Sequence, residues 1–262
     1  MAYALITGAG KGIGKAIALE LAARGYDILL VSRTENDLIA LAEQARQSYG
    51  VQASYWVGDL SAPDAARHVF DWVTSLNVSL EVLVNNAGYG MSGLFLQQDY
   101  NKLENMMQLN MLSLTAFIHR FAPSLQQQKR SYILNVASTA AYQATPGLST
   151  YAASKTYVLA LSRGLNQEFK RSGLSVTCIC PGPTNTAFFE RANLGAKGLE
   201  QIKKVHMESR DVARIAVKAM LKRKPEVVPG LQNKSVAFLS WLLPKSVIES
   251  VADRLLKGVM KE

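Results

Sequence analysis

A tyrosine and a lysine four residues apart form the combination in this chain that is best suited to acid–base chemistry. Tyr151 and Lys155 lie in the segment YAASKTYVLALSRGL, whose pattern predicts a helix, so both side chains should share one face. A free tyrosine has a pKa of about 10, and a neighbouring ammonium group favours the phenolate and lowers that value. We therefore expect Tyr151 to exchange a proton with a carbonyl or alcohol oxygen, tuned by Lys155.

A serine at the end of a predicted strand can assist such a reaction. Ser138 ends the apolar segment SYILNVAS, at the edge of an α/β sheet where substrates bind. Its hydroxyl can donate a hydrogen bond to the oxygen on which negative charge develops. Ser138 is therefore expected to contact the substrate.

A glycine-rich turn, ITGAGKGIG, stands between the first predicted strand and the first predicted helix. Glycine lets the backbone turn sharply and approach a pyrophosphate, whose charge then meets the free N–H groups at the helix start. Strand, turn, helix and next strand follow one another as in a dinucleotide site. The residues of this turn expected to bind the cofactor are Gly8, Gly10, Lys11, Gly12, Ile13 and Gly14.

The end of the second predicted strand favours NADP over NAD. A dinucleotide site usually has an acidic residue there, about 20 residues after the glycines, to bind the ribose hydroxyls. This chain has Ser32 and Arg33 instead, and the acid within the strand, Asp27, lies at its other end. The guanidinium of Arg33 can bind a 2′-phosphate through two hydrogen bonds, and Lys11 can add a second positive charge.

The elements that must position these residues alternate between strands and helices, which predicts a doubly wound α/β fold with a parallel sheet. The expected strands span residues 3–7, 27–32, 52–57, 80–86, 131–138, 175–181 and 226–229. The expected helices span residues 12–24, 35–48, 62–75, 102–127, 151–170 and 209–222, with two more near the end. Ser61 is expected to cap the third helix. The length of 262 residues favours one domain, 1–262, with helices on both faces of the sheet.

The chain resembles the short-chain dehydrogenase/reductase family in seven motifs that occur in order. They are TGAGKGIG at 7–14, Asp59-Leu60, NNAG at 85–88, Asn110, Ser138, Tyr151-x-x-x-Lys155 and Pro181-Gly182. The resemblance implies a Rossmann fold and a catalytic tetrad of Asn110, Ser138, Tyr151 and Lys155. In that family the asparagine holds a water that links the lysine to solvent, and the lysine also binds the nicotinamide ribose.

Further cofactor contacts are implied by the same resemblance. They are Asp59 and Leu60 at the adenine, Asn86, Ala87 and Gly88 on the adenosine side, and Tyr151, Lys155, Pro181, Gly182, Thr184 and Thr186 toward the nicotinamide and phosphates. The implied activity is that of an NADP(H)-dependent oxidoreductase, which interconverts a carbonyl and an alcohol by hydride transfer with the tyrosine as acid or base.

In this family the segment after the sixth strand forms a lid over the substrate. In this chain that segment spans residues 187–207. Phe188 and Phe189 of that segment are predicted substrate residues, together with Ser138 and Tyr142. The two phenylalanines could wall an apolar pocket, and the residues expected opposite them are Tyr89, Ala140, Tyr142 and Gln143. Such an apolar pocket suggests a hydrophobic ketone or aldehyde as the small-molecule substrate. The tail resembles the branch that contains 17β-hydroxysteroid dehydrogenases, very-long-chain 3-oxoacyl-CoA reductases and related bacterial reductases.

Several alternatives stay open at this point. A 3-oxoacyl thioester reductase and a steroid or pterin reductase fit the same motifs. From another class, the chain could be an NADP-binding scaffold or redox sensor without turnover. By resemblance, the long helices at 102–127 and 151–170 suggest a homodimer or homotetramer.

Composition and charge bear on location and partners. The chain is 48% hydrophobic and 19% charged, with no leader segment and no apolar run of about 18–20 residues, so a globular cytoplasmic protein is expected. No metal site is expected, because the histidines are scattered and the closely spaced Cys178 and Cys180 suit buried core thiols. Nucleic acid is not expected either, because LKRKP is a single short basic run without interleaved aromatics.

Most of the net charge of +9 lies in the last part of the chain, where 201–262 contain thirteen Lys/Arg and six Asp/Glu. This excess either solvates the surface or attracts anionic ligands or lipid headgroups. The C-terminal extension, 233–262, has an apolar block and then a helical stripe of Val247, Ile248, Val251, Leu255 and Val259. The stripe could pack on the domain or a neighbouring subunit, lie peripherally on a membrane, or admit a long acyl chain.

Overall fold

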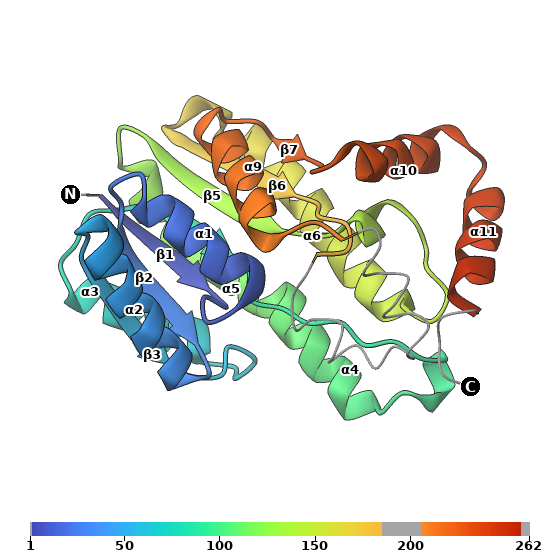
Figure 1. The fold of residues 1–262 in the computed structure, drawn as a ribbon, viewed down its shortest axis with the longest axis horizontal. Coiled ribbons are helices and arrows are strands. Elements are labelled where there is room, and N and C mark those ends of the chain that lie inside the picture. Colours follow the sequence, from blue (N-terminus) through green and yellow to red (C-terminus); the bar gives the residue numbers. More distant parts are fainter. Residues whose placement is uncertain (1, 185–205, 258–262) are drawn as a thin grey trace.

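The computed structural model describes residues 2–184 and 206–257, with side chains to Arg254. Within these residues, seven parallel strands form one sheet in the order β3-β2-β1-β4-β5-β6-β7 (Figure 1). The strands are β1 Tyr3–Thr7, β2 Asp27–Ser32, β3 Ala53–Val57, β4 Leu80–Asn85, β5 Ser131–Val136, β6 Leu174–Ile179 and β7 Glu226–Val227. The strand order reverses between β1 and β4, which creates the switch point where open α/β sheets bind ligands. The predicted sheet is confirmed.

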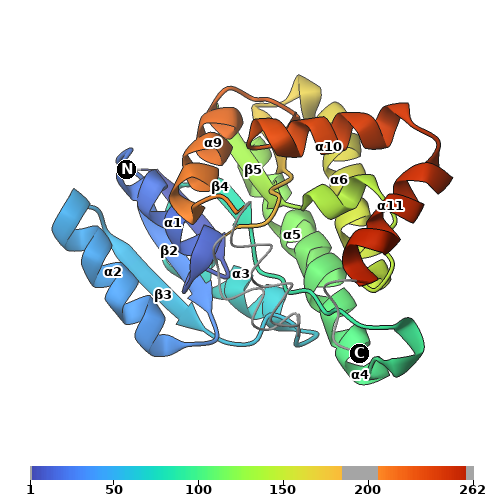
Figure 2. The ribbon, with the colours of Figure 1, turned by 45° about the vertical axis from the view of Figure 1, so that its right-hand side comes forward.

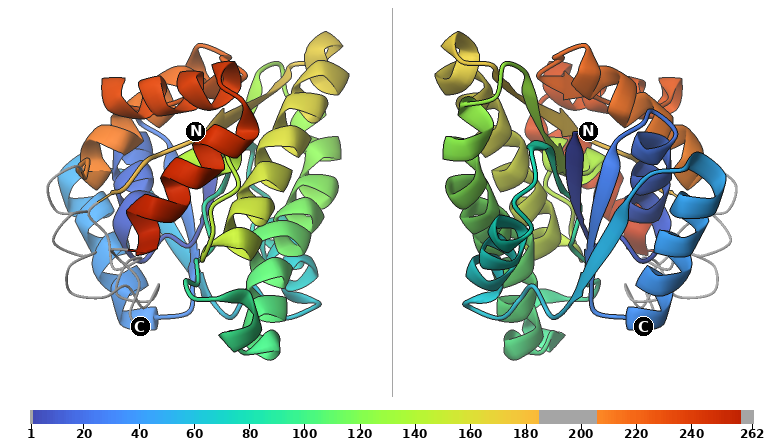
Figure 3. Two further views of the ribbon diagram at one scale, coloured as in Figure 1. Left: turned by 90° about the vertical axis from the view of Figure 1, so that its right-hand side faces the viewer. Right: turned by 90° about the vertical axis from the view of Figure 1, so that its left-hand side faces the viewer.

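Helices cover both faces of this sheet, as Figure 2 and the two end-on views in Figure 3 show. One face carries α1 Gly12–Ala22, α2 Glu35–Tyr49 and α9 Ser209–Leu221, and the other carries α3 Ala65–Ser75, α5 Leu114–Gln126 and α6 Ser149–Glu168. Alternate residues along a strand serve the two layers: Ala4 and Ile6 of β1 join one core cluster and Leu5 joins the other. The doubly wound prediction is therefore confirmed.

The helix predicted over 102–127 is divided into three segments. It consists of α4 Tyr100–Met107, a π-helical segment Gln108–Ser113, and α5. The apolar pattern continues across the π-helical residues, so the sequence contains no signal for the change. A π-helical turn widens the backbone locally and is frequent at functional sites, and this one contains Asn110, which is 1% exposed.

Ser61 does not cap the third helix, contrary to the prediction. The helix α3 begins at Ala65, and Asp64 occupies its N-cap position without a side-chain capping bond. The backbone N–H and the hydroxyl of Ser61 both donate to Oδ1 of Asp59, at 2.9 and 2.8 Å. The competing turn with Asp59 thus uses the serine before the helix starts.

Two helices follow β7 and form the C-terminal extension. Helix α10 spans Leu231–Leu242 and α11 spans Lys245–Lys257, and the break between them contains Pro244, which cannot continue a helix. Figure 1 shows them beyond the β7 edge of the sheet, far from α2 and α3. Across the described residues, none of the helices combines the length and the apolar character of a membrane span.

Candidate active site

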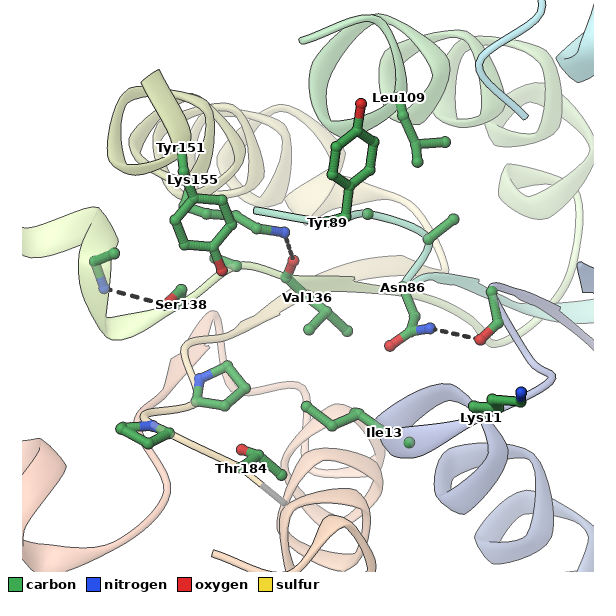
Figure 4. A pocket seen from close by; sticks show the side chains of 18 of the residues that line it. Lys11, Ile13, Asn86, Tyr89, Leu109, Val136, Ser138, Tyr151, Lys155 and Thr184 are labelled. Atoms are coloured by element: carbon green, nitrogen blue, oxygen red, sulfur yellow. Dashed lines mark hydrogen bonds between the residues drawn. The ribbon is translucent and has the colours of Figure 1, made fainter. Parts of the chain in front are cut away.

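A cavity of about 520 Å³ lies at the carboxyl ends of the strands, next to the switch point (Figure 4). Eighteen of the residues predicted from the sequence line it: Gly8, Gly10, Lys11, Gly12, Ile13, Ser32, Arg33, Asp59, Leu60, Asn86, Ala87, Gly88, Ser138, Tyr151, Lys155, Pro181, Gly182 and Thr184. Gly14, Asn110 and Tyr142 are not in this wall. Thr186, Phe188, Phe189 and the lid as far as residue 205 lie outside the described residues.

The glycines of the glycine-rich turn expose bare backbone at one end of the cavity. Gly8 and Gly12 have φ angles of +65° and +58°, which residues with a Cβ rarely adopt. The side chain of Asn86 holds the turn from β4, since its Nδ2 donates to the carbonyl oxygens of Thr7 and Gly8, each at 3.0 Å. The turn leads directly into α1, whose first N–H groups are free to bind an anion. These residues fit the diphosphate of a dinucleotide.

Gly14 lies behind these glycines, where α1 packs against the turn. A Cβ at Gly14 would lie 2.3 Å from the carbonyl oxygen of Gly8, so the helix can approach the turn closely only without a side chain there. Gly14→Ala is expected to destabilise the protein by about 2 kcal/mol or more, because overpacking against backbone forces the turn to shift.

Gly164 is the matched control for that substitution, because it is also helical but has nothing within 4 Å of an added Cβ. Gly164→Ala in α6 is expected to stabilise the protein by roughly 0.5–1 kcal/mol through helix propensity alone. Urea denaturation of both variants measures the two shifts. Equal changes in the free energy of unfolding would contradict the close approach at Gly14.

Two ion pairs occupy the end of the cavity beside β2. Nζ of Lys11 lies 3.3 Å from the carboxylate of Asp37, and the guanidinium of Arg33 lies 3.7 Å from that of Asp59. Burial alone would raise the pKa of Asp59, but hydrogen bonds from Ser61 and the charge of Arg33 lower it overall. Both cations predicted to select the cofactor therefore stand in the cavity wall, each beside a carboxylate.

Asp37 was missed by sequence reasoning, which considered only acids near the ends of the second strand. It lies in the first turn of α2, and its Cβ is 3.2 Å from the position of a Cβ added at Gly10. The only signal in the sequence is its position: Asp37 lies five residues after Ser32 and is the third residue of the helical segment ENDLIAL. Because Asp37 lines the cavity beside Lys11, it opposes a second negative charge at this point.

Tyr151 and Lys155 extend from α6 onto the end of β5, with Ser138 beside them (Figure 4). Burial raises the pKa of Tyr151 to about 12, although a hydrogen bond with Ser138 acts in the opposite direction. Nζ of Lys155 lies 5.8 Å from the centre of the tyrosine ring. The sequence predicted a phenol with a lowered pKa; in the protein alone burial outweighs the hydrogen bond with Ser138, and the phenol stays protonated.

Lys155 is held between β5 and the turn after β4. Its Nζ donates to the carbonyl oxygen of Val136 at 3.0 Å, and it lies 3.5 Å from the position of a Cβ added at Gly88. The same added Cβ would be 2.8 Å from Oδ1 of Asn110. Gly88 thus leaves the space between Lys155 and Asn110 free of a side chain, which is the space that a linking water would need.

Asn110 is fixed by three hydrogen bonds. Its Oδ1 accepts from the backbone N–H of Tyr89 at 3.1 Å, and its Nδ2 donates to the Tyr89 carbonyl at 2.9 Å and to Oγ of Ser154 at 3.1 Å. The π-helical segment therefore joins the turn after β4 to α6, behind the cavity wall. Asn110 positions the loop that contains Gly88.

Burial lowers the pKa of Lys155 to about 8, whereas an unfolded lysine titrates near 10.4. Between these two values the unfolded chain binds more protons, so the free energy of unfolding should rise with pH across this interval. Urea unfolding at pH 7.5 and 9.5 should show a larger rise for the wild type than for Lys155→Met, which has no charge to bury. Identical pH profiles for the two proteins would disprove this assignment.

The far end of the cavity is uncharged in the residues described there. Its wall is made by Thr139, Ala140, Gln143, Thr145, Leu148, Pro183, Val236 and Ala252. Val236 belongs to α10 and Ala252 to α11, so the C-terminal extension closes this end. Oγ of Ser240 donates to Oε1 of Gln143 at 3.1 Å and fixes α10 on the wall. That the C-terminal extension packs on the domain was one of the alternatives left open by the sequence, but Val236 and Ala252 were not among the predicted site residues.

Tyr142 differs from the sequence prediction, which made it a substrate contact. Its hydroxyl donates to Oε1 of Glu226 on β7, and that carboxylate also pairs with Arg163 at 2.6 Å. Burial raises the pKa of Tyr142, and the neighbouring Cys180 and Glu226 raise it further. The ring therefore packs behind the wall, and Gln143 is the adjacent residue that reaches the cavity. Cys178 and Cys180 are both buried, as the sequence predicted.

Comparison with known proteins shows which family the chain matches and which proteins are similar to it. Residues 2–197 match the family model described as short chain dehydrogenase. A very-long-chain 3-oxoacyl-CoA reductase from Anas platyrhynchos is 35% identical over 186 residues, which are 69% of this chain and 59% of that protein. Hydroxysteroid dehydrogenase-like protein 1 from Gallus gallus is 33% identical over 182 residues, 68% and 54% of the two chains. This chain thus spans less than two thirds of the length of either relative.

A solved structure is similar over nearly the whole chain. It is that of a short-chain dehydrogenase from Sphingobium yanoikuyae in complex with NADPH, with 30% sequence identity and a TM-score of 0.82. The similarity covers 98% of this chain and 96% of the other, so it includes the C-terminal helices as well as the sheet.

Proposed function

Because the chain belongs to the short-chain dehydrogenase/reductase family of oxidoreductases, as its motifs predicted, we propose that it is an NADP(H)-dependent reductase of hydrophobic ketones or aldehydes. The observation that carries this proposal is the buried phenol of Tyr151, hydrogen-bonded to Ser138 and 5.8 Å from the Lys155 amine at the cavity wall. A protein that only bound the cofactor would need the glycine turn, but not this group.

The proposed roles follow from the protonation states. NADPH, when bound, supplies a hydride to the carbonyl carbon. Tyr151 holds its proton, with a pKa of about 12, and gives it to the carbonyl oxygen as negative charge develops there. Oγ of Ser138 accepts a hydrogen bond from the backbone N–H of Ala140 at 3.2 Å, and its own O–H, which bonds to Tyr151 in the protein alone, can turn to the substrate oxygen and stabilise the same charge.

Lys155 completes this arrangement by restoring the proton of Tyr151. Its bond to the Val136 carbonyl uses one of three N–H donors, so the others are available to the cofactor ribose and to a water beside Asn110. A lysine with a pKa of about 8 exchanges protons readily near neutral pH. In the oxidative direction the same groups remove the proton from an alcohol.

We further propose NADPH as the preferred cofactor, supported by Lys11 and Arg33 in the cavity wall. Both side chains are more than half exposed, so a 2′-phosphate can replace their carboxylate partners Asp37 and Asp59. The similar dehydrogenase from Sphingobium yanoikuyae was solved with NADPH. Asp37 weakens the preference, because its carboxylate repels the phosphate that Lys11 attracts.

The substrate class rests on the uncharged end of the cavity. The described residues there offer aliphatic carbon and three neutral polar groups, Thr139, Gln143 and Thr145, to a ligand. A neutral, largely apolar carbonyl compound suits this wall, whereas a carboxylate near the reacting carbon would lose its hydration without a partner.

Oxidation of NADPH, followed at 340 nm over a panel of compounds, tests the function. The panel contains bulky diketones, steroid ketones, aldehydes and 3-oxoacyl thioesters, each assayed also with NADH. Turnover of neutral hydrophobic ketones with NADPH is the expected result. Tight NADPH binding with no oxidation across the panel would favour a cofactor-binding scaffold instead.

A homo-oligomeric state and a cytoplasmic location stay predictions. The helices expected to form a subunit interface, α5 and α6, are joined within the chain by a 2.8 Å hydrogen bond between Thr115 and Tyr157.

A further inference from the structure

Helix α10 turns its bulky apolar residues away from the protein. A surface helix normally buries its apolar stripe and exposes its polar side. Here the side that faces the domain carries Asn233, Ala237 and Ser240, at positions i, i+4 and i+7. The opposite side is exposed by 82% at Leu231, 58% at Phe238, 76% at Trp241 and 57% at Leu242. The rings of Phe238 and Trp241 lie 6.1 Å apart, so these residues form one apolar surface.

Polar contacts fix α10 in this orientation. Nδ2 of Asn233 donates to the carbonyl oxygen of Pro229 at 2.7 Å, and Ser240, which is 1% exposed, donates to Gln143. Nζ of Lys245 donates to the carbonyl oxygen of Ser240 at 2.7 Å and closes the end of the helix. Rotation of the helix to hide its apolar side would break the bond between Ser240 and Gln143, which joins α10 to the domain.

Helix α11 continues the same surface. Two residues of its predicted apolar stripe, Val247 and Val251, are 47% and 50% exposed, and Ala252, which is outside that stripe, is buried in the cavity wall. Figure 3, in its left-hand view, shows α11 at the front with α10 above it, both on the side of the molecule away from α2 and α3. We call Leu231, Phe238, Trp241, Leu242, Val247 and Val251 the α10–α11 face.

Charge indicates what covers the α10–α11 face. Lys234 lies one turn from both Leu231 and Phe238 on α10 and is exposed. The whole chain has a net charge of +9. A second copy would bring the same lysine and the same net charge against this face, whereas an anionic lipid surface would bring the opposite charge. Exposed Trp, Phe and Leu beside Lys are the composition of helices that lie in a membrane interface.

We propose that the α10–α11 face binds peripherally to a bilayer that contains anionic lipid. The apolar side chains enter the headgroup region, and Lys234 contacts lipid phosphates. Val236 and Ala252, on the inner sides of the same two helices, line the uncharged end of the cavity. A carbonyl compound dissolved in the bilayer would therefore meet the cavity wall nearby, and this last step rests on the proposed reductase function.

Vesicle flotation of the full chain tests the binding without any substrate. The wild type should float with phosphatidylcholine vesicles that contain about 30% phosphatidylglycerol, and at least tenfold less with phosphatidylcholine alone. The double variant F238S/W241S should lose at least tenfold in vesicle affinity. The control Y49S/L76S removes apolar side chains that are 42% and 36% exposed on α2 and after α3, and should float like the wild type.

Two further readouts separate this proposal from its rivals. The emission of Trp241 should shift to shorter wavelength with anionic vesicles, and F238S/W241S should keep wild-type turnover of a water-soluble ketone. Failure of the wild type to float, or flotation of F238S/W241S with wild-type affinity, would overturn the proposal. So would analytical ultracentrifugation that shows F238S/W241S converting a dimer to monomers, because the face would then be covered by a second copy.

Discussion

Replacement of Tyr151 by phenylalanine is expected to lower kcat/KM for ketone reduction by about 10²–10⁴-fold, the range that a positioned general acid contributes. The phenol is buried beside Ser138 and keeps its proton, since burial raises its pKa to about 12. The variant loses only the hydroxyl, so the ring still fills its place over Lys155. Steady-state NADPH oxidation with the best ketone of the panel measures the loss.

Tyr157 offers a matched control for this variant. It lies on the same helix, but its hydroxyl bonds to Thr115 outside the cavity. Tyr157→Phe should therefore keep kcat/KM within about threefold of wild type, with at most about 1 kcal/mol lost from stability. NADPH affinity, measured by fluorescence, should be unchanged in Tyr151→Phe. Near-wild-type turnover by Tyr151→Phe would disprove the proposed role and with it the mechanism.

The double variant Lys11→Ala/Arg33→Asp is expected to weaken NADPH binding by about 100-fold and NADH binding by less than about threefold. Each cation lost from a phosphate removes a charge-assisted contact of about 1.5 kcal/mol, at the lower end of the usual range because both side chains are exposed. NADH has no 2′-phosphate, so it loses little. Fluorescence titration of the two cofactors gives the ratio, and equal losses for both would refute the selector assignment.

Charge-matched controls make this result specific to the site. Lys129→Ala/Arg67→Asp changes the net charge equally, and Arg67 pairs with Asp64 and Asp71 on α3, outside the cavity. This variant should bind NADPH like the wild type. A third variant should have the opposite effect on affinity. Asp37→Asn should tighten NADPH binding by about threefold, because Lys11 then has no competing carboxylate. Weaker NADPH binding by Asp37→Asn would show that Asp37 instead orients Lys11.

Much of the site could be predicted because it depends on residues that are close together in the sequence. The spacing of Tyr151 and Lys155 puts both on one helix face wherever that helix packs, and the glycine turn needs only its own positive φ angles and the start of α1. The alternation of strands and helices was enough to predict seven parallel strands, since each strand needs a crossover helix before the next parallel neighbour.

Residues that depend on neighbours distant in sequence were misjudged or missed. Tyr142 was expected at the substrate, but Glu226 on β7 draws its hydroxyl away from the cavity. Asp37 was not considered, because only the folded turn brings Lys11 within 3.3 Å of it. The π-helical turn at Asn110 has no mark in the apolar pattern, and the residues that Asn110 contacts from it, Tyr89 and Ser154, are 21 and 44 positions away in the sequence.

By itself, then, the sequence determined the sheet, the phosphate-binding turn and the Tyr151–Lys155 pair, because helix periodicity, glycine stereochemistry and strand patterning act over a few neighbouring residues. Only the tertiary structure decided the protonation of the pair, with the phenol of Tyr151 raised and the amine of Lys155 lowered in pKa. It also decided which side of α10 faces outward. Both outcomes depend on burial, which arises when distant segments pack together and exclude water.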